Sequence, residues 1–456
     1  MSGLSLILET ARRALMTQQA AISVTSHNIS NASTEGYTRQ RANLSATPAL
    51  WERYGYVGTG VEVESITRLR DGYLDGQVRY SNSIESSATT QQNVLSQVEA
   101  SFNEPSDAGL SSAMTAFFNS WQDLSTHPED SSSRNAVIQQ GTLLSQGFQR
   151  LHTELTQEYN SMNDDIAGTM SSINQLTSEI SDLNTQIVAA QTTGAEPNDL
   201  EDARDSKLDD LSKLVNISVS TDTGGSVVVS IGGMTVVSRG GAVALTTAVV
   251  GGQTQIVTAK DNTKVNVTSG ELGGDLTLYN TTIPGYLSKL DELAGALINR
   301  VNTLHSAGYG LGTPPSTGTN FFTGTTAADM SVNAAVAADP SLVAASQDGS
   351  PGDNQVALAI ANAANDKVLT GNTMTVAQFY NSLASSVGSD INSAGSTATS
   401  TQLVLTQLEN QRSSVSGVSL DEEMTNLIQY QHSYDAAARL VNVADQMFQT
   451  VLTMVQ

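Results

Sequence analysis

The clearest structural pattern in this 456-residue chain lies at residues 420–455, LDEEMTNLIQYQHSYDAAARLVNVADQMFQTVLTMV. Apolar side chains recur through the segment about every 3.5 residues, and no proline or glycine interrupts them. The spacing predicts one helix of about 54 Å, because each helical residue rises about 1.5 Å. The positions of this apolar stripe are Leu420, Met424, Leu427, Tyr430, Tyr434, Ala437, Val441, Ala444, Phe448, Val451 and Val455.

A stripe this narrow does not stabilise a long helix alone. Ordering the backbone costs roughly 1–2 kcal/mol per residue, whereas each apolar side chain of the stripe returns only about 1.5–3 kcal/mol at full burial. The other end of the chain offers a partner with a heptad rhythm, formed by Leu4, Leu8, Ala11, Leu15, Ile22 and Ile29. We therefore expect the two ends to pack on each other or on other copies of the chain, and to be protease-labile in the monomer outside a body of residues 60–410.

The middle of the chain predicts a mainly α fold with a small antiparallel β insertion. Helical spacing dominates residues 83–215, then short β-branched runs separated by Gly-Gly pairs follow, and helical spacing resumes at Ile283. Further helices are predicted around residues 379–391 and 403–408. The expected organisation is the N-terminal half of a coiled-coil domain (1–60), a helical body (61–215), a β-rich insertion (216–282), a second part of the body (283–412) and the C-terminal half of the coiled-coil domain (413–456).

Composition excludes several classes of partner and site. The formal charge of −24 repels nucleic acid and anionic membranes, and no apolar run is long enough for a membrane span, so we expect neither partner. Cysteine is absent, which excludes disulfides and thiolate metal sites. The five histidines are far apart and no catalytic or phosphate-binding motif is found, so no catalytic residue, metal or cofactor is expected. The acidic run at residues 421–423 is expected to be either a solvated helix face or a first turn that stabilises the helix dipole.

Residues 27–39, HNISNASTEGYTR, form the most specific motif in the chain. Asparagines favour helix ends, and Gly36 is predicted to adopt a positive φ in a turn that aims Tyr37 and Arg39 away from the first helix. The pattern Asn-Ile-Ser-Asn-x-x-Thr-x-Gly-Tyr-x-Arg is similar to the N-terminal signature of bacterial flagellar rod, hook and hook-associated proteins. On this resemblance the candidate assembly residues are Asn28, Asn31, Thr34, Gly36, Tyr37 and Arg39.

Other stretches narrow the resemblance to the family of flagellar hook-associated protein 1. They are SGELGG at 269–274, IPGYL at 283–287, NRVNTLHSAG at 299–308, SLDEE at 419–423 and SYDAAAR at 433–439. The resemblance implies a secreted structural protein of the extracellular flagellum, exported unfolded through the type III channel, that forms a ring at the hook–filament junction and whose terminal helices build an inner coiled-coil tube. Its implied partners are other copies of itself, the hook protein, the second hook-associated junction protein and an export chaperone at the C-terminal helix. The C-terminal candidates for assembly are Leu427, Tyr434, Arg439, Val441, Phe448 and Val451.

Two other functional hypotheses remain open at this point. The chain could be another flagellar axial protein, such as the second junction protein or a flagellin-like protein. A secreted hydrolase would need a polar cluster on the β insertion or on the Gly/Pro loop at 308–320, and none stands out in the sequence.

Overall fold

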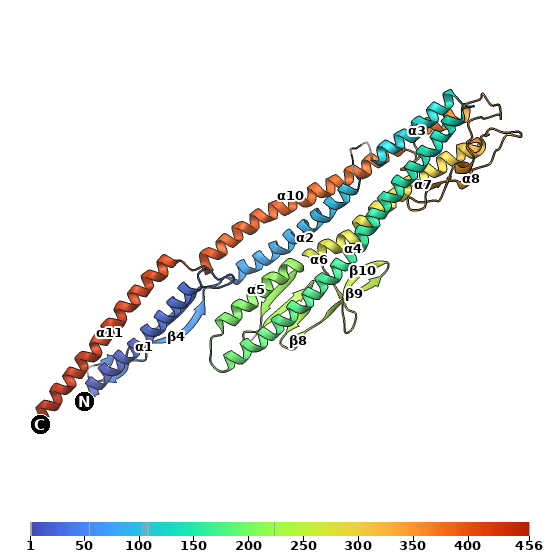
Figure 1. The fold of residues 1–456 in the computed structure, drawn as a ribbon. Coiled ribbons are helices and arrows are strands. Elements are labelled where there is room, and N and C mark those ends of the chain that lie inside the picture. The colour runs from blue at the N-terminus through green and yellow to red at the C-terminus, as the bar shows by residue number, and fades with distance from the viewer. Residues whose placement is uncertain are drawn as a thin grey trace.

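A computed structural model describes residues 2–53, 55–102, 104, 106, 109–222 and 224–455. The molecule is elongated, and both termini lie at the same end (Figure 1). That end, called here the terminal rod, contains α1, α11 and the strands β1–β4. The rest of the chain forms a helical body with a small β insertion beside it.

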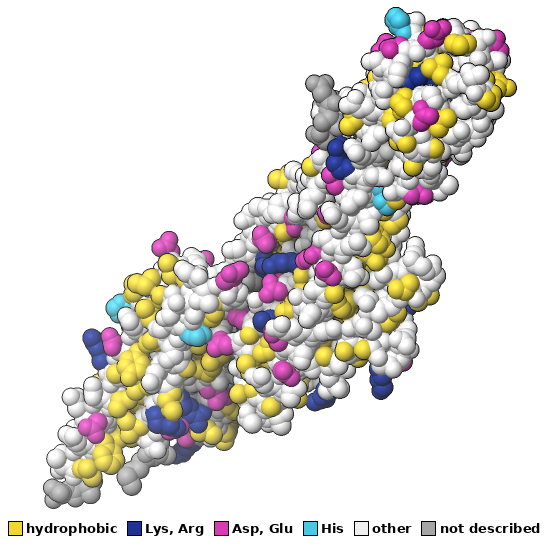
Figure 2. Space-filling view, turned by 45° about the vertical axis from the view of Figure 1, so that its right-hand side comes forward, with side chains coloured by type: hydrophobic (Ala, Val, Ile, Leu, Met, Phe, Trp, Pro, Cys, Tyr) yellow, Lys and Arg dark blue, Asp and Glu magenta, His cyan; other side chains and the backbone are white. Residues whose placement is uncertain are grey.

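The terminal rod is built on two antiparallel helices, α1 (Ser2–Ser30) and α11 (Leu420–Val455), which lie side by side. The expected pairing of the two ends thus occurs within one chain. Figure 2 shows that many hydrophobic side chains remain exposed along this rod. The apolar stripes are therefore only partly covered by their pairing.

A β-ribbon packs on α1 and was not expected from the sequence. Its long arms, β1 (Gln40–Ala46) and β4 (Val61–Arg68), pair antiparallel, and its tip consists of β2 (Leu50–Glu52) and β3 (Gly55–Val57). The expected boundary at residue 60 falls immediately before β4. Because polar and small residues fill both faces of β1, its sequence carries little of the alternation that predicts a strand.

Long helices form the body. They are α2 (Gly72–Phe102), α3 (Leu110–Thr126), α4 (Ser131–Thr192), α5 (Asn198–Leu214), α7 (Ile283–Ala307) and α10 (Val376–Ser416), joined by the shorter α6 (Glu271–Thr277), α8 (Ala334–Ala338) and α9 (Gln355–Asn362), the π-helical η1 (Leu278–Thr282) and the 3-10 turns η2 (Pro340–Leu342) and η3 (Ala363–Asn365). Helix α10 runs along α2 and leads back toward the terminal rod (Figure 1).

Two predicted helical boundaries differ from the structure. The helices expected at 379–391 and 403–408 are one helix, α10, which continues through the small residues between them because it packs along α2. The SGELGG segment, expected inside the β insertion, instead starts α6, and the helical path then runs through η1 into α7.

The β insertion contains two small antiparallel sheets. One has the order β5-β6-β7-β8 and the other β11-β10-β9. The strands are β5 (Ile217–Thr221), β6 (Val227–Ile231), β7 (Met234–Ser238), β8 (Gly241–Ala242), β9 (Leu245–Val250), β10 (Gln253–Thr258) and β11 (Lys264–Val265). Their apolar faces pack against α4 and α5 and form a core of their own. A further two-stranded pair, β12 (Phe322–Thr323) and β13 (Ser331–Val332), lies in the body.

The largest core lies between α3, α4, α7, α9 and the start of α10, and aromatic side chains fill its centre. Trp121, Phe117 and Phe321 are fully buried and in mutual contact. His305 is buried beside them and contacts the Thr319 carbonyl through Nδ1, while its Nε2 accepts a hydrogen bond from the backbone of Ala344. Burial lowers the pKa of His305 to about 4, so this histidine is a neutral structural residue.

Candidate functional site at the meeting point of the chain ends

The site lies where α1 ends and α11 begins, and Asn28 is at its centre. Asn28 is 1% exposed, and its Nδ2 donates to the Gln40 carbonyl (2.8 Å) and to the Glu423 carboxylate (3.1 Å). Its Oδ1 accepts hydrogen bonds from the Gln40 N–H (3.0 Å) and the Tyr37 hydroxyl (2.7 Å). Both the donor and the acceptor ends of the amide are used, so aspartate and leucine, which have a similar size, cannot make the same contacts.

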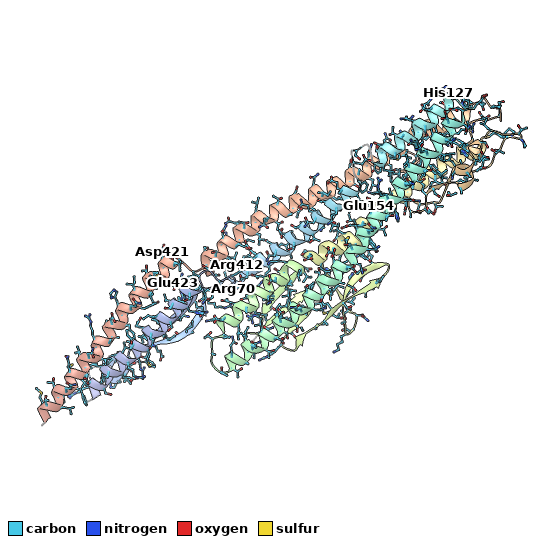
Figure 3. All side chains as sticks on the ribbon, viewed as in Figure 1. Arg70, His127, Glu154, Arg412, Asp421 and Glu423 are labelled. Atoms are coloured by element: carbon cyan, nitrogen blue, oxygen red, sulfur yellow. The ribbon has the colours of Figure 1, made fainter. Side chains whose placement is uncertain are left out.

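Arg39 supplies the second link between the two ends of the chain. Its guanidinium contacts the Glu423 carboxylate at 2.7 Å and the Glu422 carboxylate at 2.8 Å, and the backbone N–H of Arg39 donates to the Ser416 carbonyl. Residues 421–423 do form the first turn of α11, but the side chain of Glu423 is only 3% exposed, so the expectation of a solvated face is wrong at this position. The reason is that the partners of Glu423 are almost 400 residues away in the sequence. In Figure 3, Glu423 lies at the point where α11 meets α1.

Gly36 makes the turn that leads from α1 to Arg39. Its φ is +79°, which confirms the predicted left-handed conformation. A Cβ at this position would meet Ser206 of α5 at 3.7 Å, an ordinary contact, so the restriction comes from the backbone angle rather than from space.

The predicted direction of Tyr37 is wrong. The side chain turns back toward α1, where its hydroxyl donates to Asn28 and its ring packs edge-on against His27. Burial raises the pKa of the Tyr37 hydroxyl, and the carboxylates of Asp199 and Asp202 raise it further. The hydroxyl therefore stays protonated and remains a hydrogen-bond donor to Asn28.

Asn31 and Thr34 stabilise the turn but do not reach α11. Asn31 donates to the His27 carbonyl (3.1 Å) and accepts from the Thr34 hydroxyl (3.2 Å). The Thr34 carbonyl then accepts from the N–H of Tyr37 (3.2 Å). The structure thus gives these two motif residues a local role.

The remaining candidates are spread along α11 and are not brought into the site. Leu427 and Val441 are half-buried, whereas Tyr434, Arg439, Phe448 and Val451 are exposed. The buried apolar positions of the helix pair are mostly small residues, namely Ala437 and Ala444 on α11 and Ala11 and Ala21, with Val24, on α1. The side chain of Val455 lies outside the described part of the chain.

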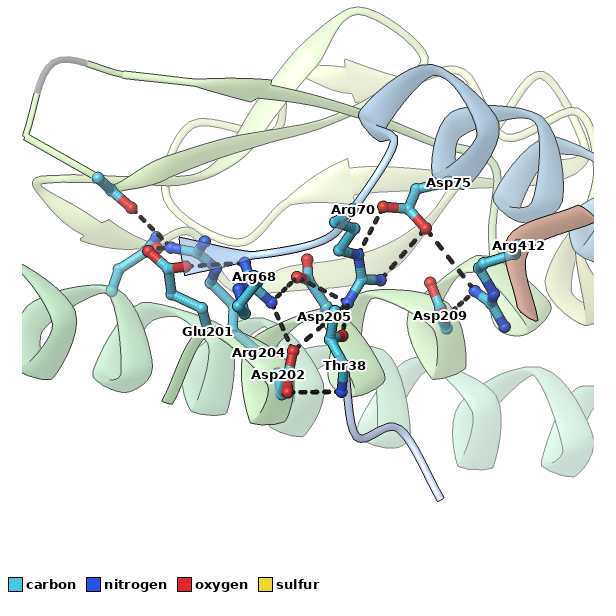
Figure 4. Close-up of polar contacts among 12 residues, drawn as sticks. Thr38, Arg68, Arg70, Asp75, Glu201, Asp202, Arg204, Asp205, Asp209 and Arg412 are labelled. Carbon is cyan, nitrogen blue, oxygen red and sulfur yellow. Dashed lines mark hydrogen bonds and ion pairs between the residues drawn. The ribbon is translucent and has the colours of Figure 1, made fainter. Parts of the chain in front are cut away.

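A cluster of ion pairs fixes this site to the body (Figure 4). The backbone N–H of Thr38 donates to Asp202 on α5 (2.9 Å). Arg68 contacts both Asp202 (2.6 Å) and Asp205 (2.9 Å), and Arg70 contacts Asp205 at 3.1 Å. The acidic face of α5 thereby binds the motif and the end of the β-ribbon together.

The same acidic face also binds α2 and α10. Arg79 of α2 contacts Asp205 and Asp209, and Arg412 of α10 contacts Asp209 at 2.7 Å. Burial by itself would raise the pKa of Asp205, but the guanidinium groups of Arg70, Arg68 and Arg79 outweigh it and hold that pKa below its ordinary value. Asp205 is therefore ionised and holds three arginines from two segments.

Sequence reasoning missed this second cluster, although a signal was present. Asp202, Asp205 and Asp209 recur at spacings of three and four on one face of the α5 sequence. Arg68 and Arg70 are two residues apart in an extended segment, which places them on one side. The missing information was that these two patterns face each other.

Across the described residues, no three His, Cys, Asp or Glu side chains are grouped so that they could bind a metal ion. The described helices also include none with the length and apolar character needed to span a membrane.

Comparisons with known proteins cover both halves of the site and the body between them. The family described as "Flagellar hook-associated protein FlgK helical domain" matches residues 95–322. Flagellar hook-associated protein 1 of Bacillus subtilis is 33% identical over 98% of this chain and 97% of its own length. This chain belongs to the flagellar hook-associated protein 1 family. It is therefore a structural protein of the bacterial flagellum.

Further members of the hook-associated protein 1 family match along the whole chain. The Salmonella typhimurium protein is 26% identical over 99% of this chain and 100% of its own length. The structure titled "The structure of the flagellar hook junction protein FlgK from Burkholderia pseudomallei" has a TM-score of 0.65 at 16% identity and covers 75% of this chain and 100% of that one. This likeness shows a shared fold.

Two other families match only the ends of the chain. The family "Flagella basal body rod protein" matches residues 8–38, and "Flagellar basal body rod FlgEFG protein C-terminal" matches residues 409–454. The first contains Asn28 and Gly36, and the second contains Glu423. The two matches therefore meet in space at the site described above.

Proposed function

We propose that this chain forms a ring at the junction between hook and filament and that the filament is assembled on this ring. One observation carries the proposal: Asn28 and Arg39 from one end bind Glu423 from the other, and so fasten both ends into one rod. A rod fixed in this way has a defined direction relative to the body, which a repeating subunit needs. Relatives named hook-associated protein 1 match over nearly the whole chain, which favours this function over a flagellin-like protein or a hydrolase.

The terminal rod is the part proposed to form the inner tube of the ring. Phe448 and Val451 are large, apolar and exposed on α11, so burial against neighbouring rods would remove them from water. Hook protein would lie on one side of the ring and the second hook-associated junction protein on the other. Arg439 and Tyr434, also exposed on α11, belong to the same assembly surface in this proposal.

Export of the chain and binding of a chaperone belong to the same proposal. The chain would pass unfolded through the type III channel to the extracellular flagellum, and a chain without cysteine cannot form premature disulfides on the way. The export chaperone is proposed to bind α11 and to shield its exposed apolar residues from water before assembly. We further propose that the protein has no catalytic activity and binds no stoichiometric metal, which elemental analysis of the purified chain would test.

Deletion of the gene tests the junction role directly. Negative-stain images of the deletion strain are expected to show hooks without filaments, and flagellin is expected in the medium. Wild-type protein supplied in trans should restore filaments and be found by immunogold at the hook tip, as should Leu403→Gln, which changes an exposed residue of the body. Filaments of normal number on deletion-strain hooks would contradict the proposal.

A further inference from the structure

The tip of the β-ribbon exposes large apolar side chains on both of its faces. Trp51 and Tyr56 pair across the strands with their rings 5.2 Å apart, and they are 70% and 76% exposed. Leu50 and Val57, the next pair, are also exposed, and they point to the opposite face because successive strand residues alternate. A two-stranded ribbon of this size is marginal in water unless it packs on another surface.

The base of the ribbon is anchored on α1, so its tip is held in a fixed place. The hydroxyl of Thr10 donates to the Thr59 carbonyl (3.4 Å), and that of Thr17 donates to the Val61 carbonyl (3.1 Å). The hydroxyls of Thr47 and Thr59 are 2.7 Å apart and buried. The ribbon therefore leaves α1 near Thr10 and presents its apolar tip beyond that point.

A second exposed apolar surface lies on the last part of α11. Its members follow one another at spacings of three and four residues, so they share one face of the helix, and all are at least 47% exposed. We call this surface the outer stripe, and it consists of Leu440, Val443, Met447, Val451 and Met454. It is distinct from the buried positions Ala437 and Ala444, which face α1.

The tip and the outer stripe lie at the same level of the rod but on different sides of it. Asn28 is bonded to Glu423, and the two helices are antiparallel with the same rise per residue, so Thr10 is level with about Val441. The ribbon packs on α1, and Figure 1 shows β4 and α11 on different sides of that helix. Both surfaces stay exposed in one chain, and copies related by rotation about a common axis would bring the two together.

Charge allows copies to approach closely at this end. Residues 1–60 contain five basic and three acidic residues, and residues 424–456 contain one basic and two acidic residues, although the whole chain has a net charge of −24. The tip contains Glu52 and Arg53, and the outer stripe is flanked by Arg439 and Asp445. Each surface thus presents one charge of each sign, which permits complementary pairing between copies.

We propose that the β2–β3 tip of one copy packs on the outer stripe of the next copy in the ring. This inference rests on the proposed ring and names the contact that would hold neighbouring rods together. Because the two surfaces differ, the contact is heterologous, and its repetition closes a ring or continues as a helix. The occupant of each apolar surface is a second copy of this chain.

Disulfide cross-linking tests the contact cleanly, because the natural chain contains no cysteine. The test variant carries Tyr56→Cys with Met447→Cys. The matched control carries Tyr56→Cys with Leu403→Cys, whose second position lies on the body and is more accessible than Met447 (70% against 49% exposed). After mild oxidation of purified hook complexes, most of the test variant should run as dimers and larger species on a non-reducing gel. The control variant, and both variants as dilute monomers, should remain at the mass of one chain.

Single variants establish that the bond joins two copies. A mixture of Tyr56→Cys and Met447→Cys chains should give dimers and no larger species. Trp51→Cys with Val443→Cys probes the same contact at adjacent positions and is used if the first pair does not assemble. Assembled junctions that stay monomeric on oxidation with both pairs, or a tip joined to a different axial protein, would overturn the proposal. If the junction role itself is wrong, the wild-type chain will be absent from hook complexes, which separates the two failures.

Discussion

The body and the terminal rod use apolar residues in opposite ways. In the body, the large residues Trp121, Phe117 and Phe148 are fully buried, and their packing stabilises the single chain. In the rod, the most deeply buried apolar positions are small residues such as Ala21 and Ala444, whereas large residues of α11 such as Leu440, Met447 and Leu452 are about half exposed. The rod therefore leaves large apolar side chains available for contacts with other molecules, whereas the body buries them within one chain.

Truncation of a core aromatic residue should have the largest effect on folding. Phe148→Ala removes a fully buried ring and is expected to destabilise the body by about 3–5 kcal/mol. Denaturant unfolding followed by circular dichroism measures the loss. Met447→Ala is the matched change in the rod and should alter the transition by less than about 0.5 kcal/mol. Equal effects of the two variants would remove the contrast between body and rod.

Asn28→Asp should weaken the closure of the rod and leave the body unchanged. The new carboxylate cannot donate to the Gln40 carbonyl and lies beside the buried Glu423, so we expect a loss of about 2 kcal/mol. Hydrogen exchange in α1 and α11 should then be roughly 30-fold faster. Asn31→Asp, in the adjacent turn, is the control and should have a smaller effect. An unchanged exchange rate in α11 would show that Asn28 does not fasten the two ends.

The pH dependence of stability should have opposite signs in the body and at the ion-pair cluster on α5 that joins the terminal rod to the body. Burial, with the carboxylates of Glu271 and Asp165, raises the pKa of Asp275 to about 7. The folded state therefore keeps a proton that the unfolded state releases, and the destabilisation grows as pH rises from about 4 to 7. Asp275→Asn should stabilise the body by roughly 1–3 kcal/mol at pH 8 and hardly at all at pH 4, as measured by thermal unfolding.

Asp205 gives the reverse case. Its lowered pKa means that the stability it contributes is present above pH 4 and is lost as pH falls through the folded value. Asp205→Asn should therefore remove part of the acid sensitivity of the ion pairs between rod and body.

The outcome that would contradict the Asp275 prediction is a stabilisation by Asp275→Asn that does not depend on pH. Relief of burial, rather than titration, would then be the cause.

The smallest change in monomer stability should accompany a large loss of assembly. Leu440→Gln alters an exposed residue of the outer stripe and should change unfolding by less than about 0.5 kcal/mol. Filament number per cell, counted by electron microscopy, should nevertheless fall sharply. Ala437→Gln, on the buried face of the same helix, should instead open the rod in the monomer and increase its proteolysis. Normal filament number with Leu440→Gln would place this residue outside the assembly surface.

Much of the fold could be predicted because helical spacing is visible in a single sequence. The helical spacing over residues 83–215 and the apolar stripe of residues 420–455 predicted the helices α4 and α11, and the motif around Gly36 predicted the turn and its positive φ. The continuity of α10 could not be predicted, because small residues with little pattern fill its middle, and packing along α2 maintains it there.

The site was only half predictable. The motif in the sequence includes Asn28 and Arg39. The sequence does not show, however, whether a carboxylate in the first turn of a helix is solvated or buried. The partner of Glu423 is fixed by the path of the whole chain. The acidic face of α5 has the same difficulty, because opposite charges on two segments do not reveal that they meet.

The bond between Asn28 and Glu423 joins positions 395 residues apart and so makes closure depend on the entire chain. The first helix and its turn lie within residues 2–39, whereas their carboxylate partner Glu423 lies in the first turn of α11. A chain that ends before residue 423 leaves Asn28 and Arg39 without that partner. Closure of the rod thus requires a chain that continues at least to Glu423, so the joining of the two helices follows the folding of everything between them.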